Sequence, residues 1–354
     1  MNVKALLLAL CLASPALAQG FADLGQATEG FAEPERRALA FPADHGAHPD
    51  FRVEWWYLTA SLTGADGRDY GAQWTLFRTA LAPEKPASEA GGWASPQLWM
   101  GHAAVTTPDA HHMAERLARG GIGQAGVVAA PFEAWIDDWQ MRSRAAPGAD
   151  ALSALDLRAA GDGFAYALTL DASGPIVAQG EAGYSVKSAH GQASHYYSQP
   201  FYRVRGSLTL GKDIVAVTGE AWLDREWSSQ PLAADQTGWD WFALMFENGA
   251  RLMAFWLRDG GPGFISATWI DAAGTPTAMP PGALHLTPLR TEKVAGRDIP
   301  VQWRLELPVQ GVDVTVQALN PQAWMPTLVP YWEGPIRVSG SHRGRGYLEM
   351  TGYE

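Results

Sequence analysis

The sequence predicts an all-β protein made of two tandem antiparallel barrels or half-barrels. Two observations lead to this prediction: the composition, and a pattern of short strands that occurs twice along the chain. The 354 residues include 16 Trp, 38 Gly and 24 Pro, a composition that favours many short strands over long helices. Hydrophobic residues make up 47% and charged residues 18%, which excludes wholesale disorder and predicts a substantial core.

The first residues indicate a secretory signal, residues 1–18. Lys4 precedes an apolar run at 5–13, and residues 16–18 are the small residues that a signal peptidase needs. The run is shorter than the ~20 residues of a membrane-spanning helix, and no later segment of the sequence is long enough either. Cys11 is the one cysteine, so the mature chain is expected to have no disulfide. We expect a periplasmic or secreted protein without a transmembrane segment.

Charge and motifs exclude several classes of function. The formal net charge is −11, and no cluster of Lys and Arg is present that would bind nucleic acid. The GxGxxG pattern at 121–126 follows an expected helix and not a strand, so no dinucleotide site is predicted. No G-x-S-x-G motif occurs, and a thiol nucleophile is excluded from the mature chain. No cofactor is predicted.

Strand-like segments follow a polar lead-in at 19–40. An aromatic run at 54–62, a turn at 64–67 and a return run at 70–77 predict a β-hairpin. A helix is expected only at Asp109–Arg119, with Asp109 as its N-cap and Gly120 just past its end. Further strands are expected at 98–106, 132–141, 152–159, 163–171, 202–210 and 214–223.

An internal repeat is the most informative feature, because self-similarity exposes domain organisation. The first match is between Trp56-Tyr57…Arg78 and Trp241-Phe242…Arg258, each an aromatic strand, a Gly turn and a return strand ending in Arg. A second match, in the same order, lies near the end of each half. It aligns Arg203-Val204-Arg205-Gly206 and Thr218-Gly219 with Arg337-Val338-Ser339-Gly340 and Thr351-Gly352.

The repeat defines the predicted domains. The signal at 1–18 and the lead-in at 19–40 are followed by a first domain at 41–228 and a second at 229–354. An antiparallel unit of this length buries its edges best by closing into a barrel. We therefore expect two tandem lipocalin-like antiparallel β-barrel or half-barrel domains.

Acidic residues beside tryptophans are the first candidate site. In an extended strand Trp222, Asp224 and Glu226 share one face, with roughly 7 Å between alternate residues, and Trp227 lies on the other face. A carboxyl kept neutral by burial can protonate a carbon atom, and aromatic faces can stabilise the resulting cation. The alternative is structural: a carboxylate paired with Arg225 would fix the junction of the two domains.

Two further carboxyls adjoin tryptophans. Asp240 lies between Trp239 and Trp241 on a face with apolar neighbours, so it needs a partner or stays protonated. Glu54 precedes Trp55-Trp56, and an ion pair with Arg78 across the hairpin is the favoured interpretation. Tryptophans are usually core residues, yet 16 exceed what this core needs, so some are expected to line a cavity.

Histidines are the next candidates. His45 and His48 have no third ligand nearby and no helix to hold them, so no metal site is expected. His45 is expected to be a hydrogen-bonding residue near the mouth of the first barrel. His195 and Tyr197 share one face of a strand, where either could orient water or donate a proton. A half-buried aromatic strand is the alternative interpretation.

Eight short motifs are spread in order over nearly the whole mature chain: 41–45 (FPADH), 54–57 (EWWY), 184–188 (YSVKS), 196–198 (YYS), 221–227 (AWLDREW), 238–242 (GWDWF), 331–334 (YWEG) and 346–353 (GYLEMTGY). Together they resemble the secreted AttH-like and carotenoid 1,2-hydratase family. The resemblance implies two lipocalin-like domains and an apolar, often isoprenoid or polyene, ligand. The activity it implies is the addition of water to the terminal double bond of an acyclic carotenoid, and related fungal proteins shape polyenes for cyclisation.

We therefore predict that the protein holds a hydrophobic small molecule between its domains and hydrates or isomerises a C=C bond by carboxyl acid catalysis. The alternative is a non-catalytic periplasmic carrier, and a role beside an export or ABC transporter is a third interpretation that the resemblance permits. The candidate catalytic residues are Asp224, Glu226, Asp240 and Tyr197. The candidate ligand-binding residues are His45, Glu54, Trp56, His195, Trp222, Trp227, Trp239 and Trp241.

Overall fold

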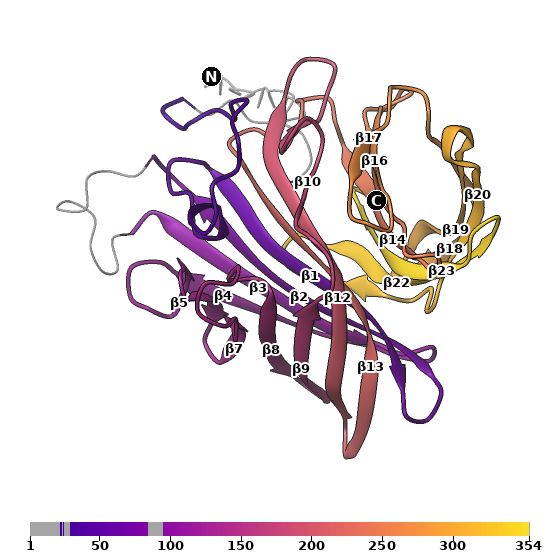
Figure 1. The fold of residues 1–354 in the computed structure, drawn as a ribbon, viewed down its shortest axis with the longest axis horizontal. Coiled ribbons are helices and arrows are strands. Elements are labelled where there is room, and N and C mark those ends of the chain that lie inside the picture. The colour runs from indigo at the N-terminus through magenta and orange to yellow at the C-terminus, as the bar shows by residue number, and fades with distance from the viewer. Residues whose placement is uncertain (1–21, 23, 25–28, 84–94, 354) are drawn as a thin grey trace, which may run out of the picture.

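The computed structural model describes residues 22, 24, 29–83 and 95–353 (Figure 1). The expected signal at 1–18, with Cys11, lies outside these residues. The described chain forms two large antiparallel sheets and short 3-10 helices, among them η2 (Ala43–His45) and η4 (Pro308–Gln310). The predicted all-β class is confirmed. Within the described ranges, no helix has the length and apolar character needed to cross a bilayer.

The first sheet has thirteen strands in the order β4-β3-β2-β1-β13-β12-β9-β8-β7-β6-β5, and β10 and β11 pair with β12. It curls around a core rich in Trp, Leu and Ala, and β4 comes to lie against β8. Its strands are β1 (Val53–Gly64), β2 (Asp69–Ala80), β3 (Gln97–Thr106), β4 (His111–Arg119), β5 (Ala125–Ala129), β6 (Phe132–Ile136), β7 (Trp139–Ser143), β8 (Ala154–Gly161), β9 (Phe164–Ala172), β10 (Val177–Ala178), β11 (Tyr184–Val186), β12 (Ala193–Leu210) and β13 (Asp213–Ser228).

The second sheet has ten strands in the order β17-β16-β15-β14-β23-β22-β20-β19-β18, and β21 pairs with β22. It surrounds a separate core and is seen nearly along its axis in Figure 1. Two tandem lipocalin-like barrels or half-barrels are thus confirmed. The strands are β14 (Gly238–Phe246), β15 (Arg251–Arg258), β16 (Phe264–Ile270), β17 (Pro276–Ala278), β18 (His285–Val294), β19 (Arg297–Leu307), β20 (Val312–Ala318), β21 (Trp324–Met325), β22 (Tyr331–Gly340) and β23 (Gly344–Thr351).

Both sheets have the same topology, because the order β3-β2-β1-β13-β12-β9-β8 reappears as β16-β15-β14-β23-β22-β20-β19. The strand register corrects the predicted alignment by one residue. Arg78 pairs with Glu54 and Arg258 with Gly238, so Tyr57, and not Trp56, corresponds to Trp241. The burial agrees, since Tyr57 and Trp241 pack in one cluster between the sheets.

Glycines test this register independently. A Cβ on Gly219 would lie 2.2 Å from the carbonyl oxygen of Ser61, and a Cβ on Gly344 would lie 2.2 Å from that of Met245. Gly219 pairs with Leu62, and Gly344 pairs with Phe246, the counterpart of Leu62. Gly219 therefore corresponds to Gly344, and its predicted match with Gly352 is wrong. The predicted match of Gly206 with Gly340 agrees with the register, because both approach a carbonyl oxygen of the next strand in the same way.

Two local predictions fail. The helix expected at Asp109–Arg119 is strand β4, which pairs with β3 along its length, because tertiary pairing overrides a weak helical preference. The single strand expected at Phe132–Met141 is two strands, β6 and β7. The chain turns between them at Asp137, whose φ of 53° lies in the left-handed region that Asp tolerates.

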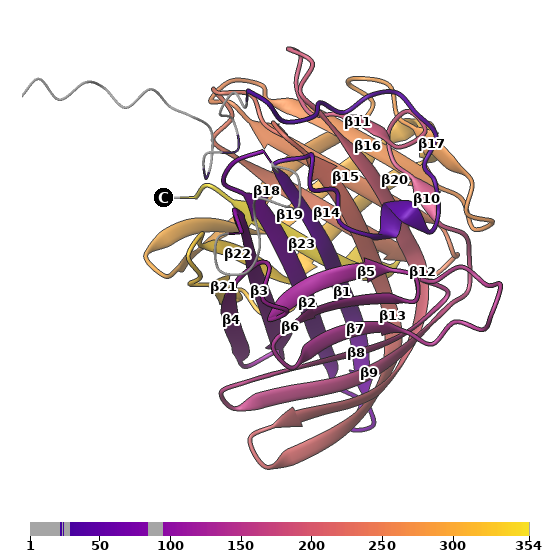
Figure 2. The same ribbon diagram turned by 90° about the vertical axis from the view of Figure 1, so that its left-hand side faces the viewer.

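The two domains pack through their central strands (Figure 1), with β1 against β23 and β2 against β22. Figure 2 shows the second sheet stacked above the first. We call this contact the domain interface. It has its own apolar cluster, which includes Tyr196, Trp222 and Met245.

Candidate functional site

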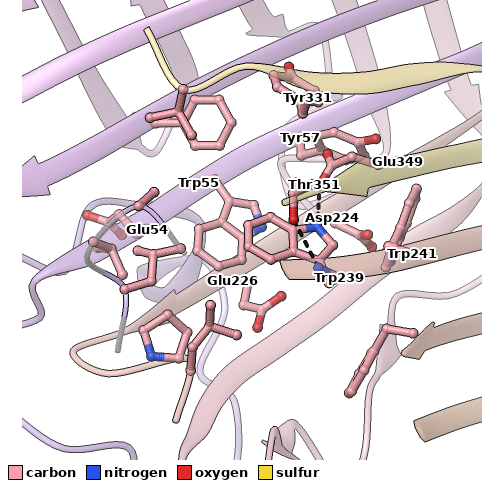
Figure 3. A pocket seen from close by; sticks show the side chains of 18 of the residues that line it. Glu54, Trp55, Tyr57, Asp224, Glu226, Trp239, Trp241, Tyr331, Glu349 and Thr351 are labelled. Carbon is pink, nitrogen blue, oxygen red and sulfur yellow. Dashed lines mark hydrogen bonds between the residues drawn. The ribbon is translucent and has the colours of Figure 1, made fainter. Parts of the chain in front are cut away.

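A cavity of about 230 Å³ lies between the two sheets (Figure 3). The first sheet lines it from β1, β2, β3, β12 and β13, and the second sheet lines it from β14, β15, β22 and β23. Pro231 and Leu232, in the connection between the domains, also line it. Its apolar wall consists of Leu24, Val53, Trp55, Tyr57, Phe77, Met100, Tyr196, Leu232, Trp239, Trp241, Phe255 and Leu257, among others.

The repeat builds the two walls from equivalent residues. Tyr57 pairs with Asp224 between β1 and β13, and its counterpart Trp241 pairs with Glu349 between β14 and β23. Asp224 and Glu349 are therefore equivalent positions, and both line the cavity. By the same register Trp55 corresponds to Trp239, whose backbone nitrogen donates to Thr351.

Asp224 is a buried acid without a cationic partner among the described residues. Its Oδ1 accepts hydrogen bonds from Trp222 Nε1 (2.6 Å) and from the Ser198 hydroxyl, and its Oδ2 accepts one from the Tyr196 hydroxyl (2.8 Å). Burial raises the pKa of Asp224 to about 7; the three hydrogen bonds oppose this rise and Glu226 adds to it. Asp224 therefore exchanges its proton near neutral pH.

Glu349 is a second such acid, which the sequence prediction did not include. Its Oε1 accepts a hydrogen bond from Trp239 Nε1 (2.6 Å), drawn in Figure 3. Burial raises the pKa of Glu349 to about 7, and the hydrogen bond from Trp239 opposes the rise. No tryptophan adjoins Glu349 in the sequence, so the search for acids beside Trp missed it. The repeat, aligned in the correct register, would have found it as the counterpart of Asp224.

Glu226 also lines the cavity, but it has a cation beside it. Lys187 Nζ lies 2.7 Å from Glu226 Oε1, and the Ser194 hydroxyl donates to the same oxygen. The ammonium also lies 4.8 Å from the centre of the Tyr196 ring and 4.3 Å from that of Phe255. Trp222, Asp224 and Glu226 share one face of β13, as predicted. The cavity wall thus includes two acids of raised pKa, Asp224 and Glu349, and the ion pair of Glu226 with Lys187.

Glu54 reaches the cavity from β1 but is held by arginines. It forms ion pairs with Arg78 and Arg225, so the predicted pair with Arg78 is present. Burial acts to raise the pKa of Glu54, but Arg225 and Arg78 hold it well below its usual range. The carboxylate that pairs with Arg225 is Glu54, and not Asp224 or Glu226, because the guanidinium of Arg225 lies on the other face of β13, over Trp56.

Asp240 lies outside the cavity. It is fully buried on the inner side of the second barrel, where Arg258 Nη1 (2.6 Å) and the Tyr353 hydroxyl (2.9 Å) contact its Oδ1. Burial raises the pKa of Asp240 to about 6, while Arg258 lowers it. The expected partner therefore exists, and Asp240 is a poor candidate for an acid that reaches a ligand.

Other predicted residues lie on the first-barrel side of the sheet or behind the cavity wall. Tyr197 binds His45 Nδ1 through its hydroxyl (2.7 Å), and His45 Nε2 lies 3.2 Å from Asp150. His195 stacks on Trp227, with ring centres 5.0 Å apart. None of these three predicted residues, Tyr197, His45 and His195, lines the cavity.

The remaining tryptophans divide by the face of their strand. Trp56 and Trp227 belong to the core of the first barrel. Trp222 does not line the cavity but donates a hydrogen bond to Asp224, whereas Trp239 and Trp241 line the cavity as predicted. Trp241 packs edge-on against Tyr57, with ring centres 5.2 Å apart.

Comparisons with known proteins place this fold and site in context. A family model described as AttH-like matches residues 32–353. The chain is similar to the crystal structure of a putative AttH from Nitrosomonas europaea, with 31% identity over 92% of this chain and 100% of that one and a TM-score of 0.78. It also resembles kievitone hydratase from Nectria haematococca, with 18% identity, 91% and 98% coverage and a TM-score of 0.65, a likeness of fold. A comparison with curated proteins found no match.

Proposed function

The chain belongs to the AttH-like family, and from this membership we propose that it binds an apolar polyene- or isoprenoid-like molecule between its domains and adds water to a C=C bond. The observation that carries the proposal is Asp224, a buried acid with a pKa of about 7 on the wall of an aromatic cavity. The likeness of fold to a protein named as a hydratase supports the reaction class. As residues 1–18 predict, we place this activity outside the cytoplasm.

The acid step uses the neutral form of Asp224. Its proton goes to one carbon of the double bond, the π electrons form the new C–H bond, and a cation is left on the other carbon. Trp55, Trp239 and Trp241 line the same space (Figure 3), and their ring faces stabilise the cation. Trp222, Tyr196 and Ser198 then stabilise the carboxylate that remains.

The second step adds water to the cation. Glu226, paired with Lys187, offers a carboxylate oxygen that orients a water molecule and accepts its proton as the new C–O bond forms. One molecule of water is consumed in total. Asp224 is ready for a further turnover once it regains the proton that Glu226 received.

Replacing Asp224 by Asn tests the proposal, with an acyclic carotenoid in detergent as the probe. Quenching of tryptophan fluorescence measures binding, and mass spectrometry detects a product heavier by one water. The Asp224→Asn variant should bind as the wild type does and form product at least about 100-fold more slowly. The matched control Asp240→Asn, outside the cavity, should keep turnover at temperatures where it stays folded.

Two outcomes would contradict the proposal. If the wild type binds the carotenoid but forms no hydrated product at any pH, the protein is a carrier, the alternative that the sequence left open. If Asp224→Asn turns over like the wild type, the acid is another residue. Mass spectrometry of lipids that copurify with the native protein would identify its ligand in either case.

A further inference from the structure

We propose that His111, Met113 and Met325 form a binding site for a soft monovalent cation, copper(I), at the edge of the contact between the two domains. None of the three residues lines the cavity, so the site is independent of the proposed function. It joins the two domains, because His111 and Met113 lie on β4 of the first sheet and Met325 lies on β21 of the second.

The central contact of the site is between an imidazole and a thioether. Nε2 of His111 lies 3.2 Å from Sδ of Met325, and Figure 2 shows β4 and β21 at the same edge of the molecule. With bonds of about 2.0 Å to nitrogen and about 2.3 Å to sulfur, the lengths found in tetrahedral zinc sites, the two donor atoms would be about 3.5 Å apart. A metal ion therefore requires them to separate by only a few tenths of an ångström.

Met113 supplies the third donor. It is two residues from His111 in β4, so the two side chains share one face of the strand. Met113 packs against a small cluster of Ala104, Met325 and Tyr331. Its partner across β3 and β4 is the small Ala104, and its three rotatable bonds allow the sulfur to turn toward the ion.

The other ring nitrogen of His111 is held by Thr106. Thr106 Oγ1 lies 2.9 Å from His111 Nδ1, and Thr106 is a buried residue that pairs with His111 between β3 and β4. A hydroxyl can donate to Nδ1 or accept from it. When Nε2 binds a metal, Nδ1 carries the ring proton and Thr106 accepts its hydrogen bond, the outer support that metal-bound histidines usually have.

The state of His111 also suits a metal ligand. Burial lowers the pKa of His111 to about 4, and the neighbouring His112 adds to the decrease. The ring is therefore neutral at pH 7, which is the form that binds metals. His111 is only partly buried, and β4 is the last strand of its sheet, so an ion can approach from solvent.

The donor set determines which metal fits. One imidazole and two thioethers carry no charge, and thioether sulfur is a soft ligand that favours copper(I) over zinc, magnesium or calcium. The next carboxylate on the same face of β4, Glu115, already contacts His102 Nε2 (3.2 Å) and accepts from the backbone nitrogen of Leu328 (2.9 Å). The described part of the chain has no cysteine to supply a thiolate.

Bound copper would connect β4 to β21 and so stabilise the contact between the domains. A ligand that binds only the folded protein raises the free energy of unfolding. At a free copper(I) concentration 100 times the Kd, the unfolding temperature should rise by roughly 4 °C. This gives a second measurement, separate from the binding assay.

Competition with the chromophoric chelator bicinchoninate, without oxygen, measures copper(I) binding. The parent protein is the full chain with Cys11→Ser, because Cys11 is the one thiol in the sequence and would bind copper(I) itself. We expect this parent to bind one copper(I) per chain.

Three variants of the parent each remove one donor while nearly keeping the volume of the side chain: His111→Phe, Met113→Leu and Met325→Leu. Each should weaken copper(I) binding at least about tenfold and remove most of the rise in the unfolding temperature. Met279→Leu is the matched control, since it removes a partly buried thioether beside the core of the second barrel. It should bind copper(I) as the parent does.

The site is wrong if the parent does not bind one copper(I), or if any of the three variants binds it as tightly as the parent. Equal weakening in Met279→Leu would mean that methionines bind copper without a defined site, which also overturns the proposal. Tighter binding of zinc than of copper(I) at these residues would contradict the soft donor set. None of these results affects the proposed function, because the cavity has no part in the measurement.

Discussion

Asp224 and Glu54 lie on paired strands, and both are buried. Yet Asp224 titrates near neutral pH, whereas Glu54 stays ionised. Two arginines face Glu54 and keep it ionised, while Asp224 has only neutral hydrogen-bond donors. Burial therefore dominates the pKa of Asp224 and is overcome at Glu54. The sequence alone does not distinguish the two acids, because each adjoins tryptophans. Their pKa values differ because Arg225 lies on the face of β13 that meets Glu54 and not on the face that carries Asp224.

Replacing Asp224 by Asn should stabilise the protein at neutral and alkaline pH. The pKa of Asp224 is raised from 3.8 to about 7, so the folded state binds the proton more tightly than the unfolded state. The contribution of Asp224 to the free energy of unfolding is therefore fully present below about pH 4, and it is lost as the pH rises through about 7. The advantage of the variant should grow over that range to roughly 4 kcal/mol, since one pKa unit is about 1.4 kcal/mol.

Chemical denaturation of both proteins at several pH values measures this difference. Asn keeps one oxygen that accepts from Trp222 and Ser198, and it places an amide donor where the protonated acid has its hydroxyl, with one N–H more. The two proteins should therefore be close in stability at low pH. A constant difference across the whole pH range would show that Asp224 does not titrate in the folded state as described.

Replacing Glu54 by Gln should destabilise the protein by about 3–5 kcal/mol, because Arg78 and Arg225 would remain buried without their carboxylate. The pKa of Glu54 lies well below its usual 4.5, so its contribution is present above pH 4.5 and is lost only in acid. The decrease in the free energy of unfolding of the variant should therefore be the same at mildly acidic and at alkaline pH, as urea titrations would show. A loss of less than about 1 kcal/mol, the usual value of an exposed pair, would contradict this account.

At the scale of strands, the sequence predicts most of the first sheet and misjudges its pairing details. Runs rich in aromatic and branched residues, joined by a Gly turn, reveal β1 and β2, whose residues are almost all buried. The segment that forms β4 has no such run, and its Asp109 and Gly120 resemble helix ends. Only its partner β3 decides its structure. The repeat was recognised, but from the sequence alone its first match was one residue out, and its second match paired Gly219 with Gly352 instead of Gly344. The second error concealed Glu349 as the counterpart of Asp224.

Gly219 and Gly344 should be equally intolerant of alanine, because each Cβ would meet a carbonyl oxygen at 2.2 Å. Each substitution forces paired strands apart and should cost about 3 kcal/mol. Gly211→Ala is the control, because nothing lies within 4 Å of the new Cβ. Its cost should be about 1 kcal/mol, which comes from placing alanine at a φ of 60°. Thermal unfolding monitored by circular dichroism compares the three; equal losses would contradict the close approach.

At the scale of the molecule, the domain interface contains too much apolar surface for the domains to behave independently. Trp241, Met253 and Phe255 from the second sheet pack with Tyr57 and Tyr196 from the first. The sequence predicted two related domains with a tryptophan-lined space between them. It could not predict which tryptophans line that space, because the choice depends on how two curved sheets meet.

The protein should therefore unfold in one cooperative transition. Separating the domains would expose the interface cluster to water, at about 25 cal/mol for each Å² of apolar surface. Differential scanning calorimetry should give a single peak whose calorimetric and van't Hoff enthalpies agree. Two resolved peaks, or a second domain expressed alone that stays monomeric and folded, would show that the interface is not part of the folding unit.

The first and last strands of each domain pair with one another, β1 with β13 and β14 with β23. The equivalent acids Asp224 and Glu349 therefore lie in the middle of the two sheets, one on each wall of the cavity. Two residues further along, the first domain has Glu226 where the second has Thr351. The two walls are thus related but unequal, so an elongated guest meets the Glu226–Lys187 pair on one side and a threonine on the other.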